Sequence, residues 1–215
     1  MKIDTLTGKN QEHLTPCGSH LIHKDILIPF TKLKESAKKE GFDLKIASAF
    51  RSFERQLTIW NEKASGVRPL LDKDEKLIDP TNLSKEEILF HILNWSMLPG
   101  ASRHHWGTDL DIFDGASLPS LDYKIQLTQE ECDTHFHSFH TWLDNNSGDF
   151  YRPYTGSSRT YCERWHISYK PIASQFEKAL SEELLSKIIK ESNILLKDQI
   201  LSNLSFIYST YCQQS

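Results

Sequence analysis

The segment Ser102-Arg103-His104-His105-Trp106-Gly107-Thr108-Asp109-Leu110-Asp111 gathers two histidines and two aspartates around a glycine. About fifty residues later the chain reads Glu163-Arg164-Trp165-His166. A hydrolytic zinc site needs three histidine or carboxylate ligands, an open position for water, and a nearby carboxylate that takes the proton of that water. The two segments supply such a set, with His104, Asp111 and His166 as the ligands and Glu163 as the base.

The first segment has the local pattern of a turn followed by a strand. Gly107 permits a tight turn, so a loop histidine, His104, and a strand aspartate, Asp111, are able to converge on one ion. Polar and apolar residues alternate over 108–113, which predicts a strand with Asp109 and Asp111 on the same face. Spacing alone also fits an ordinary loop that binds no metal.

The second segment needs a bend to work as a site. Residues i and i+3 oppose each other on a regular strand, so a bulge or turn is required to bring Glu163 and His166 together. Without such a bend, His166 is a neutral core histidine on an aromatic strand and Glu163 is solvated. The segment by itself leaves both interpretations open.

The periodicity of the remaining chain predicts an α+β fold. The pattern is that of a small antiparallel sheet that carries a zinc site, flanked by helices, with extra C-terminal helices. A charged stretch over 67–83 with two prolines is typical of an insertion or lid. We expect strands over 44–49, 108–113, 149–154 and 165–169, and helices over 23–40, 53–64, 84–97, 128–143, 171–180, 182–192 and 197–211.

Length and composition indicate one decorated domain. At 215 residues with 38% hydrophobic residues, the chain is long enough to bury a sizeable core. We expect a catalytic domain over residues 1–181 and a helical extension over 182–215 packed on it.

Charge and hydropathy exclude several classes of partner. The formal net charge is −4 and basic residues are scattered, which favours neither nucleic acid nor an anionic membrane surface. No apolar run approaches the ~18 residues of a membrane span, and the first fourteen residues are too polar for a secretory signal. Four widely spaced cysteines are typical of reduced thiols. We therefore expect a cytoplasmic protein with no nucleic-acid or membrane partner.

Three motifs in order resemble a known family. Ser48-Ala49-Phe50-Arg51-Ser52 is followed by Gln56, then by Ser-x-His-x-x-Gly-x-x-x-Asp over 102–111, then by Glu-x-Trp-His over 163–166. Together they resemble the VanY-type zinc carboxypeptidases of peptidoglycan metabolism, which act as D-alanyl-D-alanine or L,D-carboxypeptidases. The resemblance spans about residues 46–169 and leaves the C-terminal helices outside.

The resemblance assigns roles to individual residues. Family members hold zinc with two histidines and one aspartate, which implies His104, Asp111 and His166 as the ligands of Zn2+. It implies Glu163 as the base and later proton donor, and Arg51 as the cation that neutralises charge on the scissile carbonyl oxygen. Substrate contacts are implied for Gln56 and Ser102, and Tyr154, at the end of the strand expected over 149–154, is a further candidate to line the cleft.

One residue departs from the family pattern. Asp109 stands where the family usually has a small residue, two positions before the expected ligand Asp111. Three roles are open to this carboxylate: it could orient a ligand histidine, attract a substrate amine such as that of diaminopimelate, or be solvated.

The expected activity is that of a zinc-dependent carboxypeptidase that releases C-terminal D-alanine from peptidoglycan stem peptides or muropeptides. Between the two specificities we favour L,D cleavage of tetrapeptides over D,D cleavage of pentapeptides, because recycled tetrapeptides are processed inside the cell. Two alternatives remain: an endolysin-like peptidoglycan endopeptidase of the same fold, and a noncatalytic zinc-binding module. The second alternative would have lost Glu163 or Arg51, and both are present.

Overall fold

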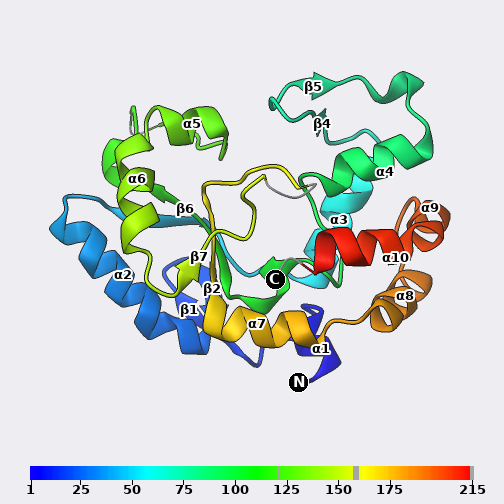
Figure 1. The fold of residues 1–215 in the computed structure, drawn as a ribbon, viewed down its shortest axis with the longest axis horizontal. Coiled ribbons are helices and arrows are strands. Elements are labelled where there is room, and N and C mark those ends of the chain that lie inside the picture. Colours follow the sequence, from blue (N-terminus) through cyan, green and yellow to red (C-terminus); the bar gives the residue numbers. More distant parts are fainter. Residues whose placement is uncertain (121, 157–159, 214–215) are drawn as a thin grey trace.

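A four-stranded antiparallel sheet forms the centre of the computed structural model, which describes residues 1–120, 122–156 and 160–213 (Figure 1). The strand order is β3-β6-β8-β7, and every neighbouring pair is antiparallel. The fold class expected from the sequence, a small antiparallel sheet flanked by helices, is confirmed. The strands are β3 (Leu44–Ser48), β6 (Asp109–Asp114), β7 (Phe150–Tyr151) and β8 (His166–Tyr169).

Two short hairpins lie outside the central sheet. The first pairs β1 (Leu14–Cys17) with β2 (His20–His23), and the sequence analysis missed it because its strands are short and one contains a proline. The second pairs β4 (Leu70–Leu71) with β5 (Leu77–Ile78) inside the stretch expected as an insertion. Figure 1 shows this second hairpin projecting at the edge of the molecule, beyond α4.

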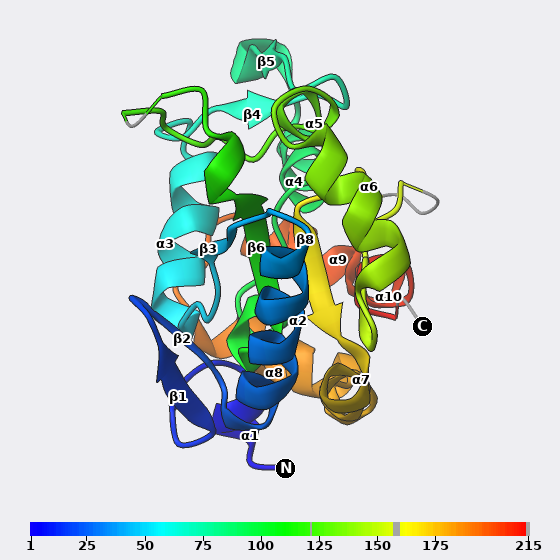
Figure 2. The ribbon, with the colours of Figure 1, turned by 90° about the vertical axis from the view of Figure 1, so that its left-hand side faces the viewer.

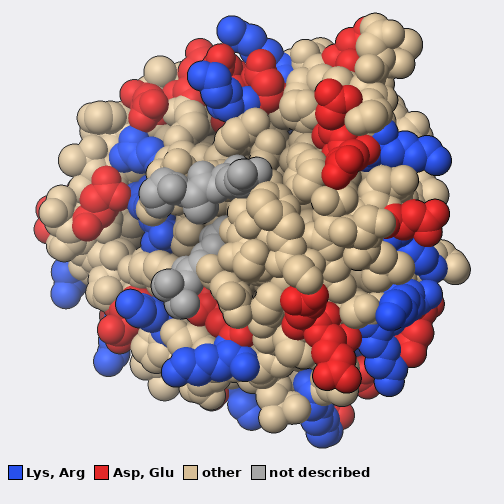
Figure 3. Space-filling model, turned by 45° about the vertical axis from the view of Figure 1, so that its right-hand side comes forward, with Lys and Arg blue, Asp and Glu red and all other residues tan. Residues whose placement is uncertain are grey.

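Helices surround the sheet, and no helix of the described residues is long and apolar enough to cross a membrane. On the face drawn in Figure 3, acidic and basic side chains are interspersed. The helices are α1 (Ile3–Leu6), α2 (Leu27–Lys39), α3 (Phe53–Ala64), α4 (Lys85–Leu93), α5 (Gln129–Asp133), α6 (His137–Asn146), α7 (Lys170–Ala179), α8 (Glu182–Glu191), α9 (Lys197–Ser202) and α10 (Leu204–Ile207).

Two expected long helices are interrupted in the structure. The helix expected over 128–143 is divided into α5 and α6, because Thr134 leaves the helical region with φ −112° and ψ −89°. The helix expected over 197–211 is divided into α9, α10 and a π-helical turn, with the break at Asn203. Helical periodicity predicted the helical segments but not these breaks.

One hydrophobic cluster packs helices α2 and α6 against the sheet. Phe30 of α2 and Phe139 of α6 share this cluster with Leu110 and Ile112 of β6, and Figure 2 shows α2 lying across the sheet. Because side chains alternate along a strand, the aspartates between and beside these apolar residues project from the opposite face. The sheet therefore presents Asp111 away from α2.

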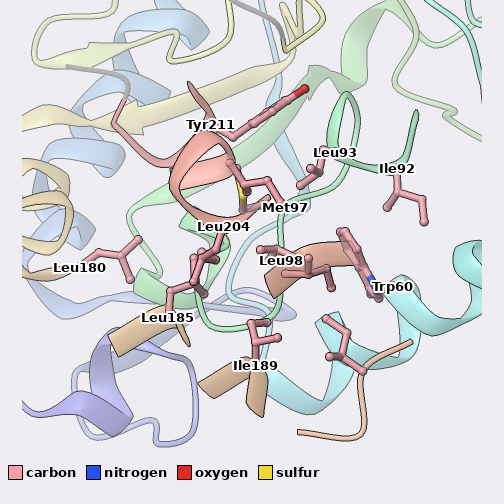
Figure 4. Close-up of a cluster of buried hydrophobic side chains, with 14 of the residues drawn as sticks. Trp60, Ile92, Leu93, Met97, Leu98, Leu180, Leu185, Ile189, Leu204 and Tyr211 are labelled. Atoms are coloured by element: carbon pink, nitrogen blue, oxygen red, sulfur yellow. The ribbon is translucent and has the colours of Figure 1, made fainter. Parts of the chain in front are cut away.

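A second hydrophobic cluster joins α3 and α4 to the C-terminal helices (Figure 4). Trp60 of α3 is fully buried there, and its indole Nε1 donates a hydrogen bond of 3.1 Å to the carbonyl oxygen of Leu195. The helices beyond residue 181 thus share a core with α3. The division into 1–181 and 182–215 stays a prediction, and residues 214–215 lie outside the described residues. Other members of this cluster are Leu93, Leu98, Leu185, Ile189 and Leu204.

If the C-terminal helices belong to the folding unit, Ile189→Ala should lower the free energy of unfolding by about 2–5 kcal/mol, because Ile189 is 0% exposed and truncation leaves a cavity. Urea denaturation measures this loss. The matched control is Ile28→Ala on α2, whose side chain is 67% exposed and which should change the free energy by less than about 0.5 kcal/mol. Equal effects of the two substitutions would contradict the prediction.

The buried His140 predicts a pH dependence of stability. Neither of its ring nitrogens has a hydrogen-bond partner within the described ranges, and burial, helped by the charges of Arg152 and Arg164, lowers its pKa to about 3. The unfolded chain binds a proton here near pH 6.5, whereas the folded chain does not. Stability therefore falls by about 1.4 kcal/mol per pH unit as the pH drops below that value.

The variant His140→Leu should remove this contribution, so its unfolding free energy should fall less steeply between pH 6.5 and pH 5 than that of the parent. Urea titrations at each pH, with chelator present to exclude metal effects, measure both slopes. Identical slopes would show that His140 is not a neutral buried group.

Candidate active site

His104 is positioned by a tight turn before β6. Gly107 has a φ of +70°, and a Cβ at this position would lie 2.8 Å from the backbone nitrogen of His23, so the turn accepts only glycine. The Nδ1 atom of His104 lies 2.8 Å from the carbonyl oxygen of Ala49. This contact places the ring proton on Nδ1 and leaves Nε2 as the free ligand atom.

Asp111 and His166 are direct neighbours on β6 and β8. Asp111 Oδ1 lies 3.2 Å from His166 Nδ1, and Asp111 Oδ2 lies 3.4 Å from His104 Nε2. Ligand atoms of the three side chains all lie within 4.8 Å of one another. Nitrogen and oxygen ligands of a tetrahedral zinc ion are about 3.3 Å apart. The spacing of the three residues therefore fits zinc.

The lack of a hydrogen-bond donor at Asp111 Oδ1 in the described part of the chain also indicates a cation site. Although it is buried, Asp111 Oδ1 accepts no hydrogen bond from any described residue. The contact between His166 Nε2 and Asp109 Oδ1, at 2.9 Å, places the ring proton on Nε2. The lone pairs of His166 Nδ1 and Asp111 Oδ1 then face each other, an arrangement that a cation stabilises.

Asp109 is the centre of a buried polar network, and its side chain is 0% exposed. Oδ1 accepts a hydrogen bond of 2.7 Å from Arg103 Nε and holds the imidazole of His166. Oδ2 accepts hydrogen bonds from Thr108 Oγ1 at 2.7 Å and from Ser168 Oγ at 3.0 Å. Of the three roles considered for Asp109, the structure supports orientation of a ligand histidine, since the carboxylate is closed off from a substrate amine.

Arg103 keeps this carboxylate ionised. Burial alone would raise the pKa of Asp109, but the charge of Arg103 and the hydrogen bond to His166 lower it. Arg103 also donates to Ser168 Oγ at 2.7 Å and pairs with Glu177 of α7. The sequence analysis missed Arg103 and Ser168. The only sequence signal for them was a carboxylate, Asp109, in a buried strand, which requires a positive partner.

Glu163 and His166 are brought together by the bend that their spacing requires. The backbone N–H of His166 donates to the carbonyl oxygen of Glu163 at 3.1 Å, which closes a turn just before β8. Glu163 Oε2 consequently lies 3.4 Å from His166 Nδ1. Burial in the cleft raises the pKa of Glu163, which suits a group that takes up and returns a proton.

Arg51 is fixed to the loop that carries His104. Its backbone N–H donates to the carbonyl oxygen of His104 at 3.0 Å, and its carbonyl oxygen accepts from His105 Nδ1 at 2.6 Å. The second ring nitrogen of His105 accepts from the backbone N–H of Gly100 at 3.0 Å, so both ring nitrogens of His105 are occupied. His105 thus holds Arg51 beside His104.

Gln56 lies behind Arg51. Its Oε1 accepts a hydrogen bond of 2.8 Å from Arg51 Nη1, and its Nε2 donates to the carbonyl oxygen of Met97 at 2.6 Å. The side chain is fully buried. These contacts orient the guanidinium, and the substrate contact expected for Gln56 stays a prediction.

A cleft of about 610 Å³ lies in front of the ligand residues. Arg51, Ser102 and Tyr154 line it together with the three ligands and Glu163, so the structure brings these sequence-predicted residues together. The ring of Tyr154 packs edge-on against His166, with 4.9 Å between ring centroids. The outer wall is formed by residues of the β4–β5 hairpin and by residues 126–128.

A buried His-Asp-His cluster, an adjacent glutamate and an arginine on the same cleft define a metal-dependent hydrolase. A model described as "VanY: D-alanyl-D-alanine carboxypeptidase" matches residues 19–172. The protein belongs to the VanY family of zinc carboxypeptidases, which act on peptidoglycan peptides as D,D- or L,D-carboxypeptidases, and His104, Asp111 and His166 are its candidate metal site.

Sequence relatives include two uncharacterized proteins of Haemophilus influenzae. One is 40% identical over 100 residues, which are 44% of this chain and 68% of that relative. The other is 35% identical over 120 residues, which are 53% of this chain and 92% of that relative.

Solved structures with the same fold include a D,D-pentapeptidase and an LD-carboxypeptidase. VanYB in complex with D-Ala-D-Ala gives a TM-score of 0.54 at 21% identity and covers 83% of this chain and 89% of that one. The LdcB LD-carboxypeptidase gives a TM-score of 0.55 at 20% identity, and the match covers 84% of this chain and 80% of that one. A VanY D,D-pentapeptidase variant in complex with Zn(II) gives a TM-score of 0.53 at 22% identity, and the match covers 80% of this chain and 88% of that one.

The network at Asp109 predicts a specific defect in metal binding. Asp109→Asn should weaken zinc affinity by about 10- to 100-fold, because the amide no longer carries the charge that fixes His166. Competition with a chromogenic chelator measures the affinity, and circular dichroism checks the fold. The control is Asp114→Asn at the other end of β6, which caps a turn by accepting from Ala116 N and should leave zinc affinity unchanged. Equal affinities of both variants would show that Asp109 does not act on the metal site.

Proposed function

We propose that the protein is a zinc-dependent carboxypeptidase that releases C-terminal D-alanine from peptidoglycan-derived peptides, with muropeptides as substrates. The observation that supports this most strongly is the convergence of the three ligand side chains, whose ligand atoms lie within 4.8 Å of one another, with Glu163 Oε2 3.4 Å from His166 Nδ1. Relatives with the same fold bind D-Ala-D-Ala and Zn(II).

The residues of the chain divide the reaction between them. His104 Nε2, Asp111 and His166 Nδ1 would hold the zinc ion, which when bound lowers the pKa of water and polarises a carbonyl group. The oxygen of the attacking water bonds to the scissile carbonyl carbon, and Glu163 accepts the proton that this water loses. As the carbon–nitrogen bond breaks, Glu163 returns that proton to the leaving amine of D-alanine.

Arg51 stabilises the negative charge that develops on the scissile carbonyl oxygen. Preorganisation matters here, because a cation already in place costs no reorganisation during the reaction. Three contacts hold Arg51 in place: its Nη1 donates to Gln56, its backbone N–H donates to His104, and its carbonyl oxygen accepts from His105. Ser102 and Tyr154, which line the cleft, contact the bound peptide in this proposal.

For the finer specificity we propose L,D cleavage of tetrapeptides, in cytoplasmic muropeptide recycling, with D,D cleavage of pentapeptides as the alternative. Mass spectrometry of products from zinc-loaded protein incubated with each peptide tests this choice. Loss of one D-alanine from the tetrapeptide supports L,D activity, whereas loss from the pentapeptide alone overturns it. Cleavage within the stem peptide would indicate an endopeptidase, and no cleavage of either peptide would indicate a zinc-binding module.

The proposed roles predict that two substitutions separate metal binding from turnover. Glu163→Gln should keep bound zinc and lower kcat by about 100- to 10,000-fold, because it removes the proton acceptor. His166→Ala should lose both zinc and turnover. Elemental analysis of the purified variants and the rate of D-alanine release measure the two effects. Turnover equal to the parent in the Glu163 variant would rule out the assigned base.

A further inference from the structure

Lys63 is a cation of the cleft that the proposed reaction does not use. It lies on α3 seven residues after Gln56, which places both side chains on the same face of the helix. Lys63 lines the cleft together with Ile59 and Arg68. Its Nζ donates a hydrogen bond of 2.7 Å to Ser96 Oγ.

The ammonium group of Lys63 has a neutral partner but forms no ion pair with any residue that the structure describes. Its cationic neighbour Arg68 is paired with Glu62 at 2.8 Å. Burial lowers the pKa of Lys63 to about 8, and the charges of Arg68 and Arg51 act in the same direction, while Glu163 opposes them. A half-buried cation without an ionic partner is stabilised by an anion.

The position of Lys63 along α3 indicates which part of a peptide it reaches. At 1.5 Å per residue, the Cα atoms of Gln56 and Lys63 are about 10 Å apart along the helix axis. An extended peptide covers about 3.5 Å per residue, so the single residue that a carboxypeptidase releases spans only part of this distance. Gln56 holds Arg51 at the reacting end, so a peptide that ran along α3 toward Lys63 would place its retained part beside that lysine.

We propose that Lys63 binds a carboxylate that the peptide carries upstream of the bond that is cut, and thereby selects substrates. This inference rests on the proposed function. Peptidoglycan stem peptides supply two such groups: the side-chain carboxylate of diaminopimelate and the free α-carboxylate of γ-linked D-glutamate. The wall that the β4–β5 hairpin supplies offers Leu71 and Leu77. Glu75, also on that wall, already accepts a hydrogen bond from the backbone N–H of Gln129 at 2.8 Å.

Calorimetry with matched peptides tests this subsite. The titrations use zinc-loaded protein with Glu163→Gln, so that peptides bind without being cut, in the presence and absence of Lys63→Met. The peptides are the diaminopimelate tetrapeptide, the same peptide with lysine in place of diaminopimelate, and the same peptide with D-isoglutamine in place of D-glutamate. Each replacement removes one upstream carboxylate.

Lys63→Met should weaken binding of the parent tetrapeptide by about 10- to 100-fold, the range of a charge-assisted hydrogen bond. It should have no further effect on the peptide that lacks the recognised carboxylate, which identifies that group. Lys63→Arg should restore most of the affinity because it keeps the charge. The matched control is Lys73→Met, which removes an exposed lysine of the hairpin that pairs with Asp74 and should leave the affinity unchanged.

Two results would overturn the inference. One is an equal loss of affinity for all three peptides, which would mean that Lys63 acts only by supporting the structure around Ser96. The other is unchanged affinity for all of them. The release of D-alanine by the protein with Glu163 intact is measured separately. If binding depends on the carboxylate but no D-alanine is released, the proposed function is overturned and the Lys63 subsite stands. If D-alanine is released but binding does not depend on the carboxylate, the proposed function stands and the subsite is overturned.

Discussion

The hydrogen bond between Asp109 and His166 Nε2 is the contact on which the site depends. It fixes the proton on one ring nitrogen, so the other faces Asp111 with a lone pair. A buried carboxylate can do this only while it is ionised, and the guanidinium of Arg103 makes that possible. Arg103 in turn pairs with Glu177 on α7, so the orientation of one ligand ring is linked to a helix outside the central sheet.

The sequence predicted the reacting residues better than the residues that support them. His104, Asp111, His166, Glu163 and Arg51 stand in motifs that resemble those of a known family, and the structure places all five around one cleft. Ser168 escaped because it stands 59 residues after Asp109, its hydrogen-bond partner, and this separation leaves no local pattern. Only the pairing of β6 with β8 makes them neighbours.

The fold shows the same division between local and non-local information. Helix α3 spans the residues 53–64 that the sequence predicted, and in the structure Ser52 caps its start. The break at Thr134 and the β1–β2 hairpin, whose strands are short and include a proline, leave no signal in the hydrophobic periodicity. The turn before His166 was predicted in part. The three-residue spacing of Glu163 and His166 showed that a bend was necessary, but not whether it is a bulge or a turn.

Helix α3 connects the reacting arginine to the C-terminal helices. Arg51 precedes its first turn, and Gln56 and Lys63 occupy the face toward the cleft. Trp60, one helical turn from each of them, packs into the second hydrophobic cluster and bonds to Leu195 beyond α8. A helix anchored by this tryptophan cannot shift without disturbing that packing. The helices after residue 181 therefore support the helix that follows Arg51, although no described residue of theirs lines the cleft.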